Sequence, residues 1–248
     1  MCKISLLLII MSYLKIFFLM LCMILVSCTG QKTGKENDNN DKIAIEVGEI
    51  KFPPQDVLQL KSYYLSSSVH VDSIDYLIGY NYRLHSLDCM NLKSKSVTQI
   101  VLPGDGPDAI VRLSGIYAQS LDSVWISDES ERAFLIDSVG TIKRMIDLKK
   151  YLEDQEQLLI NTNYAMFTSH LFYNASRHSL MFLVKHTPSN TFIVKEAFID
   201  EVGKMATYQL SSSKVVPDMS KGYAYINFPN VNFVGENIVY NYPVESSI

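Results

Sequence analysis

Residues that carry chemistry in many enzymes are present in this sequence, but their spacing matches no catalytic or metal-binding pattern. The histidines are His70, His85, His170, His178 and His186. None of them forms the His-x-His or His-Glu-x-x-His spacing of zinc sites. On one strand His178 and His186 would lie about 26 Å apart, too far to share a metal. Ser114 lacks the earlier glycine of a nucleophile elbow. Local spacing therefore predicts no catalytic residue and no metal ligand, although residues from distant parts of the chain could still converge.

Gly104-Asp105-Gly106 is the glycine-rich stretch that could cradle a phosphate. Pro107 directly after it removes a backbone donor, and no helix N-terminus follows to hold an anion. We interpret the stretch as a tight turn between two repeated units, where glycine supplies a positive φ and proline fixes the exit. No phosphate-binding cofactor, and no cofactor of another kind, is expected.

The acidic residues and the cysteine of the body are expected to be structural. Asp38, Asn40 and Asp41 lack the glycine and the distal glutamate of a calcium loop. Other acids are expected at turns and strand ends, where a carboxylate accepts local backbone N–H groups: Asp72, Asp75, Asp122, Asp128 and Asp137. Cys89 is expected to be a small buried apolar residue, because no cation near it in the sequence would stabilise a thiolate.

Aromatic residues gather near the end of the sequence and offer weak candidates for ligand binding. The four tyrosines considered are Tyr223, Tyr225, Tyr240 and Tyr242, with Phe228 and Phe233 between them. Such rings combine contact area with a polar group, which suits a binding surface. The other interpretation is that these rings belong to a hydrophobic core, and we favour it.

The first residues have the layout of a bacterial lipoprotein signal peptide. Residues 4–26 are almost entirely apolar, but Lys15 in their middle disfavours a membrane-spanning helix. If the true start is Met11 rather than Met1, Lys15 becomes the positive n-region of a signal peptide. The tetrad Leu25-Val26-Ser27-Cys28 is similar to a lipobox, so we expect a diacylglyceryl group on Cys28. The alternative is an uncleaved N-terminal membrane helix.

The sequence then divides into three parts: a signal peptide at 1–27, a lipidated cysteine with a tether at 28–42, and a folded domain at 43–248. The tether, Thr29 to Lys42, has no apolar side chain, so it cannot offset the entropy of ordering. The whole chain is 48% apolar and 19% charged with a net charge of −4, which excludes a polybasic nucleic-acid binder and a disordered protein.

The folded domain is expected to be all-β, because short runs of Val, Ile, Tyr and Phe alternate with turn residues. The expected strands are Ile43–Ile50, Tyr76–Tyr80, Arg83–Leu87, Ser96–Leu102, Ser123–Ser127, Ala133–Asp137, Thr141–Asp147, Ser179–Lys185, Phe192–Ile199, Lys204–Leu210 and Ile238–Tyr242. One short amphipathic helix is predicted at Leu148–Ile160, where the apolar residues fall near helical spacing. A weaker helical candidate is Gln55–Tyr64.

An imperfect repeat suggests a partial β-propeller. A strand, a short connection and a second strand ending near Asp and Gly recur from Asp75, Asp122, His178 and Asn237, at offsets of 47, 56 and 59 residues. This is the range of propeller blades with loop insertions. About four blades of an expected six are recognisable, so we expect a chain that is truncated at its C-terminus. The alternative fold is a complete β-sandwich.

These features resemble one family. The lipobox at Cys28, the polar tether, the stretch Pro103–Pro107, the strand start Leu121–Ile126, and Ala133–Asp137 with Gly140 are similar to uncharacterised six-bladed β-propeller lipoproteins of Bacteroidales. The resemblance covers residue 43 to the end and implies a fold more than an activity. It brings no catalytic residues to this sequence. Members are generally longer than this chain.

We therefore expect a lipid-anchored protein of the cell envelope that binds a ligand or partner and is not an enzyme. The expected partners are the membrane, through the anchor, and a protein or a glycan, but no nucleic acid. The alternative function is a propeller hydrolase or lyase that acts on a glycan or lactone. Acids directly after the lipidated cysteine are typical of surface-exposed lipoproteins in this group, and Thr29 to Lys32 contain none. We therefore favour an outer-membrane lipoprotein that faces the periplasm.

Overall fold

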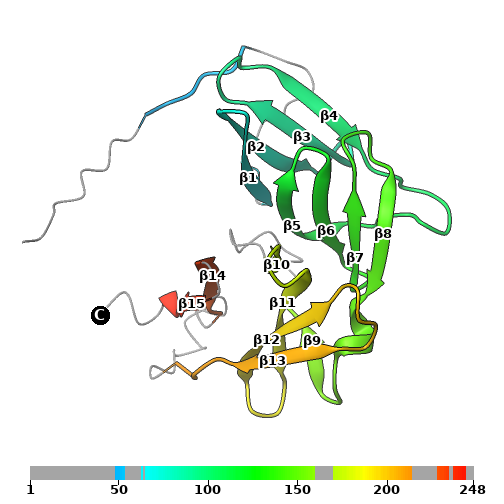
Figure 1. Ribbon diagram of the computed structural model, residues 1–248, viewed down its shortest axis with the longest axis vertical. Helices are drawn as coiled ribbons and strands as arrows, with labels where there is room; N and C mark the ends of the chain where they lie inside the picture. Colours follow the sequence, from blue (N-terminus) through cyan, green and yellow to red (C-terminus); the bar gives the residue numbers. More distant parts are fainter. Residues whose placement is uncertain are drawn as a thin grey trace, which may run out of the picture. The chain divides into compact units, whose positions relative to one another are not determined.

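The described part of this computed structural model is built from antiparallel β-sheets (Figure 1). The structure describes residues 48–53, 63, 65–159, 170–213, 228–234 and 237–243. All described strands lie in the compact unit Ile50–Ile248. These residues contain no α-helix, and a 3-10 turn lies at Leu148–Tyr151. The expectation of an all-β fold is therefore confirmed.

The first two sheets have four strands each, in sequence order. The first sheet contains β1 (Ser66–Val71), β2 (Ile74–Asn81), β3 (Ser86–Asn91) and β4 (Val97–Val101). The second sheet contains β5 (Leu113–Ser120), β6 (Ser123–Asp128), β7 (Arg132–Ile136) and β8 (Ile142–Asp147). In both sheets each strand pairs with the next along the chain, so short hairpins make every connection within a sheet.

The third sheet repeats this order with one addition, and a hairpin follows it. The third sheet contains β10 (Leu171–Asn174), β11 (Ser179–His186), β12 (Thr191–Phe198) and β13 (Met205–Gln209), and β9 (Glu156–Leu158) also pairs with β11. The last described strands, β14 (Asn230–Val234) and β15 (Asn237–Asn241), form a two-stranded antiparallel hairpin.

Both faces of the central strands are buried, and the alternation of side chains sends successive residues to different cores. In β11, Leu180, Phe182 and Val184 pack into a core shared with the second sheet. Met181 and Leu183, on the opposite face, pack into a core shared with the β14–β15 hairpin. A third core joins the first and second sheets, through residues such as Ile78 and Phe134. Consecutive sheets are thus held by apolar side chains on facing surfaces.

The first strands of neighbouring sheets also meet. β1 contacts β5, and β5 contacts β10. Ser67 of β1 accepts a hydrogen bond on its Oγ from the backbone N–H of Ala118 in β5, at 3.0 Å. The sheets therefore approach one another along their first strands as well as through their faces.

One turn occurs in two sheets with nearly the same sequence. The β7–β8 turn reads Asp137-Ser-Val-Gly140, and the β12–β13 turn reads Asp200-Glu-Val-Gly203. Both glycines have positive φ, 86° and 82°. Asp137 accepts hydrogen bonds from the backbone N–H groups of Val139 and Thr141. Its hydrogen bond with the Lys143 ammonium, at 2.7 Å, lowers the pKa of Asp137 to about 2.

Nine of the predicted strands are confirmed, apart from residues at their ends. They correspond to β2, β4, β6, β7, β8, β11, β12, β13 and β15. The first strand of every sheet was missed, so the repeats noted in the sequence begin at second strands. The predicted strand Arg83–Leu87 is wrong in position, because His85 adopts a φ of 49° in a turn and β3 begins at Ser86. Gly48 to Ile50, the described end of the predicted strand Ile43–Ile50, is not a strand.

The predicted amphipathic helix at Leu148–Ile160 is also wrong. Asp147 caps only one 3-10 turn, accepting from the Lys149 backbone N–H at 3.2 Å, and β9 follows. Leu148 and Leu158 reach the core from this irregular segment, so their burial does not require a helical face. The helical candidate Gln55–Tyr64 lies outside the described residues except for Tyr63, and the signal peptide, Cys28 and the tether lie outside them entirely.

Candidate binding site

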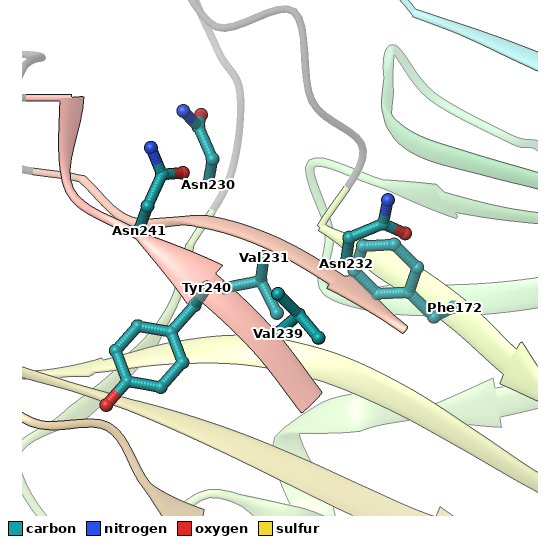
Figure 2. Close-up of a pocket in the computed structure, with 7 residues that line it drawn as sticks. All are labelled: Phe172, Asn230, Val231, Asn232, Val239, Tyr240 and Asn241. Atoms are coloured by element: carbon teal, nitrogen blue, oxygen red, sulfur yellow. The ribbon is translucent and has the colours of Figure 1, made fainter. Parts of the chain in front are cut away.

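A pocket of about 450 Å³ lies at the β14–β15 hairpin (Figure 2). This volume falls in the range of ligand pockets, roughly 300–1,000 Å³. Its lining residues carry no formal charge and include three asparagines. They are Phe172, Asn230, Val231, Asn232, Val239, Tyr240 and Asn241.

The hairpin is amphipathic, and its register determines which side chains are available. Its inner face packs on the third sheet through Val231, Phe233, Ile238 and Tyr240. Its other face is exposed, and there Asn230 lies opposite Asn241 and Asn232 opposite Val239. Two adjacent cross-strand pairs therefore present three carboxamides and one isopropyl group on the same surface.

The Phe172 side chain supplies an aromatic wall from a different sheet. Phe172 lies in β10, and its ring packs against Phe233 with the ring centroids 4.5 Å apart. Phe172 and Asn232 both line the pocket, and they overlap in the view of Figure 2. The Oδ1 atom of Asn232 accepts a hydrogen bond from the backbone N–H of Phe233 at 2.9 Å, which restrains the amide group.

Two of the four candidate tyrosines are described. Tyr242 is 3% exposed, and its hydroxyl donates a hydrogen bond to the Ser211 carbonyl at 2.8 Å. The Tyr240 hydroxyl accepts one from the Ser211 backbone N–H at 2.9 Å. Both rings belong to the core under the hairpin, while Tyr240 also lines the pocket. Tyr223 and Tyr225 lie outside the described residues. The pocket asparagines were not found from the sequence, because Asn in a sequence indicates a turn.

The histidines stay apart in the described residues, where no group of three or more His, Cys, Asp or Glu side chains could hold a metal ion. His70 pairs with Asp75, His178 with Asp200, and His186 bonds to Ser189. His85 donates from Nε2 to the Ile110 carbonyl at 2.7 Å. Each of these four side chains has a local partner.

His170 differs, because it is buried. Its Nδ1 donates to the Leu159 carbonyl at 3.3 Å, and its Nε2 has no hydrogen-bond partner among the described residues. Burial lowers its pKa from 6.5 to about 4. The neutral form is therefore favoured in the folded protein, and its contribution to stability is complete above pH 6.5. As the pH falls from 6.5 towards 4, protonation favours the unfolded chain.

We expect the free energy of unfolding to fall by about 2 kcal/mol between pH 7 and pH 5 through His170 alone. Urea unfolding of the wild type and of His170→Gln at these two pH values measures it. The variant should lack this part of the pH dependence. Equal pH dependence in both proteins would contradict the assignment to His170.

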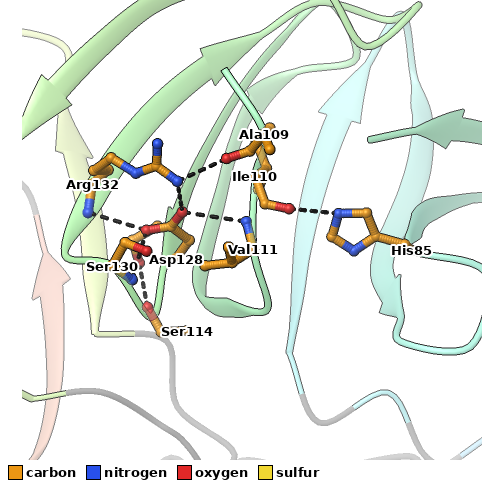
Figure 3. Close-up of polar contacts among 9 residues, drawn as sticks. His85, Ala109, Ile110, Val111, Ser114, Asp128, Ser130 and Arg132 are labelled. Carbon is orange, nitrogen blue, oxygen red and sulfur yellow. Dashed lines mark hydrogen bonds and ion pairs between the residues drawn. The ribbon is translucent and has the colours of Figure 1, made fainter. Parts of the chain in front are cut away.

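Asp128 and Asp137 accept local backbone N–H groups at turns, as expected from the sequence. Asp122 instead accepts the backbone N–H of Ser138, in the β7–β8 turn. Asp128 is fully buried and also accepts from Arg132 Nη2 at 2.7 Å. The same Nη2 donates to the Ala109 carbonyl at 2.7 Å. From the first sheet, His85 donates to the carbonyl of the next residue, Ile110 (Figure 3). Both sheets thus fix the loop that connects them. Gly106 in this loop has a φ of 91°, which confirms the predicted turn.

Cys89 is 5% exposed on β3, as expected. Burial, reinforced by the neighbouring Asp88 carboxylate, raises the pKa of its thiol to about 11. We therefore expect Cys89 to react with iodoacetamide at least about 100-fold more slowly in the folded protein than in urea, since the thiolate is the nucleophile. Mass spectrometry of the peptide that contains Cys89 measures the two rates. Rapid labelling without urea would contradict a buried thiol.

A buried polar cluster covers the face of the first sheet opposite its core. Asp88 is fully buried and accepts hydrogen bonds from Tyr63 Oη at 2.5 Å, Asn81 Nδ2 at 2.9 Å and Gln99 Nε2 at 2.6 Å. The carboxylate is thus satisfied by neutral donors. We interpret this cluster as the attachment of Tyr63 to the first sheet.

The described residues define an all-β protein whose sheets pack in sequence order and whose candidate site is an uncharged pocket. No described helix is long and apolar enough to cross a membrane. No family model matches the chain, and no curated protein matches it.

Among solved structures, the chain is similar to a member of the DUF4221 family from Bacteroides vulgatus ATCC 8482, known from a crystal structure at 1.75 Å resolution. The identity is 13% and the TM-score 0.35, over 66% of this chain and 62% of that chain. The match thus spans less than two thirds of that protein. A likeness at this level assigns neither a ligand nor an activity to this chain.

Proposed function

We propose that this protein is a non-enzymatic binding module of the cell envelope, anchored by a lipid on Cys28 and built from β-propeller blades. The binding role rests on the pocket at the β14–β15 hairpin, which combines carboxamides with an aromatic and an aliphatic wall. The anchor rests on the Leu25–Cys28 tetrad and on the apolar run before it. With this anchor, we place the protein in the outer membrane, facing the periplasm.

The propeller arrangement has two supports. Three sheets share the same strand order, and each packs face to face on the next. Their first strands contact one another, as they do when blades surround a central channel. We expect a crystal structure to place β1, β5, β10 and β14 around one axis. Two sheets packed as a sandwich would contradict this arrangement.

The pocket chemistry favours binding over catalysis. Carboxamide, aliphatic and phenyl groups do not exchange protons as general acids or bases do. The Tyr240 hydroxyl also belongs to a lining residue, but it accepts a hydrogen bond from the Ser211 backbone N–H, and the ring packs on the core under the hairpin. They can fix a ligand by hydrogen bonds and by apolar contact. The alternative, a hydrolase or lyase acting on a glycan or lactone, needs acid–base groups that converge on the ligand.

Lipid labelling tests the anchor. Cells that express the full chain should incorporate radiolabelled palmitate into it, and the labelled protein should sediment with outer membranes. Cys28→Ser should abolish the label, whereas the matched control Cys22→Ser, within the signal peptide, should retain it. If Cys28→Ser still carries the label, Cys28 is not the lipidated residue. Protection from protease added to intact cells is expected for a periplasm-facing domain.

Mass spectrometry of a bound ligand separates a binding module from an enzyme. The full chain, purified in detergent, is incubated with neutral oligosaccharides and with a simple lactone. A binding module returns every compound with unchanged mass. Hydrolysis adds the mass of water and lyase cleavage yields an unsaturated product, and either result would favour the enzyme.

A further inference from the structure

We infer that the ligand of the β14–β15 pocket is an uncharged polyhydroxylated molecule, namely a sugar unit of a neutral glycan. This inference rests on the proposed function and deepens it by naming the ligand class. Four observations carry it: the uncharged lining, the paired carboxamides, the aromatic wall, and the composition of the two strands.

The lining discriminates by charge. An ionic ligand that leaves water needs an opposite charge or several strong hydrogen bonds, because burial of a lone charge is costly. The seven lining side chains provide no charge of either sign. A neutral ligand enters such a pocket without this penalty.

The carboxamides match hydroxyl groups. Each Asn side chain offers two N–H donors and one carbonyl acceptor, and each hydroxyl both donates and accepts. Asn230 and Asn241 face one another across the hairpin, and Asn232 lies two residues further along the same face. Figure 2 shows Asn230 and Asn241 close together and Asn232 towards Phe172. Neighbouring hydroxyls on one sugar ring can therefore meet neighbouring amides.

The apolar groups match the other face of a sugar. A pyranose ring carries hydroxyls around its edge and C–H groups on its faces, so it packs on an aromatic surface while its edge is hydrogen-bonded. Phe172 lines the pocket, although its ring also packs on Phe233 of the inner face. Val239, 51% exposed, adds apolar area on the same side of the hairpin as the amides.

The composition of the strands is the independent observation. Three of the ten residues in β14 and β15 are asparagines that line the pocket, although strands disfavour this residue. The side chains on this face are exposed, so packing in the described fold does not explain their presence. Recognition of a ligand with mixed donors and acceptors does explain it.

An extended peptide is the competing ligand, and it would bind differently. A peptide that adds to a sheet edge uses backbone N–H and C=O groups of the edge strand. The pocket is lined by residues of both strands of the hairpin and of β10. The lining therefore favours a compact ligand on the face over a strand on the edge, and the test includes both.

Titration calorimetry of the full chain in detergent tests the inference. The probes are maltohexaose, xylohexaose and mannohexaose, an anionic oligogalacturonate of similar length, and a neutral ten-residue Thr/Val peptide. We expect at least one neutral hexaose to bind. Asn230→Ala and Asn232→Ala should each weaken its binding about tenfold, since each removes hydrogen bonds to the ligand.

Asn237→Ala is the matched control, because Asn237 lies on the same hairpin, is exposed and is not part of the pocket. Its affinity should stay within about twofold of the wild type, since no lining group changes. Equal urea midpoints for the wild type and the three variants show that each one is folded.

Three outcomes would overturn the inference: no binding of any neutral hexaose, binding of the oligogalacturonate or the peptide alone, or hexaose binding that the two pocket variants leave unchanged. The proposed function fails on a different result, the conversion of a ligand into product. Peptide or anion binding without conversion would therefore reject the glycan and keep the binding module.

Discussion

Replacing Lys195 with methionine is expected to lower the free energy of unfolding by about 3–5 kcal/mol. Lys195 lies in β12 with a fully buried side chain. Its ammonium is 2.7 Å from Glu156 Oε2 and 3.1 Å from Glu153 Oε1. The Glu156 side chain is only 5% exposed, so removal of the lysine leaves a buried carboxylate without its cation. The energetic cost comes mainly from this unpaired charge.

The same three residues fix the connection between the second and third sheets. Glu153 and Glu156 lie in the segment that leaves β8 and pairs with the edge of β11 through β9. Lys195 is on the next strand, β12, so its two ion pairs hold this segment against the third sheet. The Lys195→Met change should therefore loosen β9 as well as lower the global stability.

Urea unfolding followed by circular dichroism measures the effect. Lys204→Met is the matched control, because Lys204 is half-exposed and pairs with Glu201 at the β12–β13 turn. An exposed pair of this kind contributes about 0–1 kcal/mol. Adding Glu156→Gln to Lys195→Met should restore part of the loss, since the buried charge is then removed. Equal losses for Lys195→Met and Lys204→Met would show that Lys195 is not a buried ion-pair partner.

This ion pair illustrates what the sequence did not reveal. The strand Phe192–Ile199 was predicted from its apolar residues, but nothing in it indicated that Lys195 points into a core. Glu156, its partner, was assigned to a helix that does not form. A contact between residues so far apart in the chain depends on how the sheets pack, and a local pattern carries no information on that packing.

The strands that were predicted are the ones with continuous apolar runs, such as β7 and β11. The missed ones have weaker patterns: β1 reads Ser-Ser-Ser-Val-His-Val, and β5 contains Gly115. Pairing with the next strand supplies the hydrogen bonds that hold them in the sheet. Their own side chains supply little hydrophobic signal, so propensity alone did not detect them.

Of the pocket residues, the sequence analysis singled out only Tyr240, as one of the aromatic candidates. The asparagines around it were not singled out, because Asn in a sequence more often indicates a turn than a binding residue. Only the register of the hairpin distinguishes a turn asparagine from a binding asparagine, because it places Asn230 opposite Asn241 on the exposed face. Register follows from which face the third sheet covers, and that is a tertiary property.

Replacing Gly140 with alanine is expected to cost about 2–5 kcal/mol, the second large effect. The residue has a φ of 86°, which an L-residue adopts at a cost of about 1–2 kcal/mol. A Cβ there would also lie 2.4 Å from the Val101 carbonyl oxygen of β4, which belongs to the first sheet. A backbone atom held in a sheet cannot move aside as a flexible side chain does, so overpacking adds about 1–3 kcal/mol.

Gly203→Ala is the matched control, because Gly203 occupies the same position of the same turn in the third sheet. Its φ is 82°, and a Cβ there would meet no atom of the described residues within 4 Å. This variant should lose only the backbone cost, about 1–2 kcal/mol. The difference between the two losses, measured by urea unfolding, therefore isolates the contact between the β7–β8 turn and β4. Equal losses would mean that this turn does not pack on the first sheet, which would weaken the face-to-face packing on which the proposed propeller partly rests.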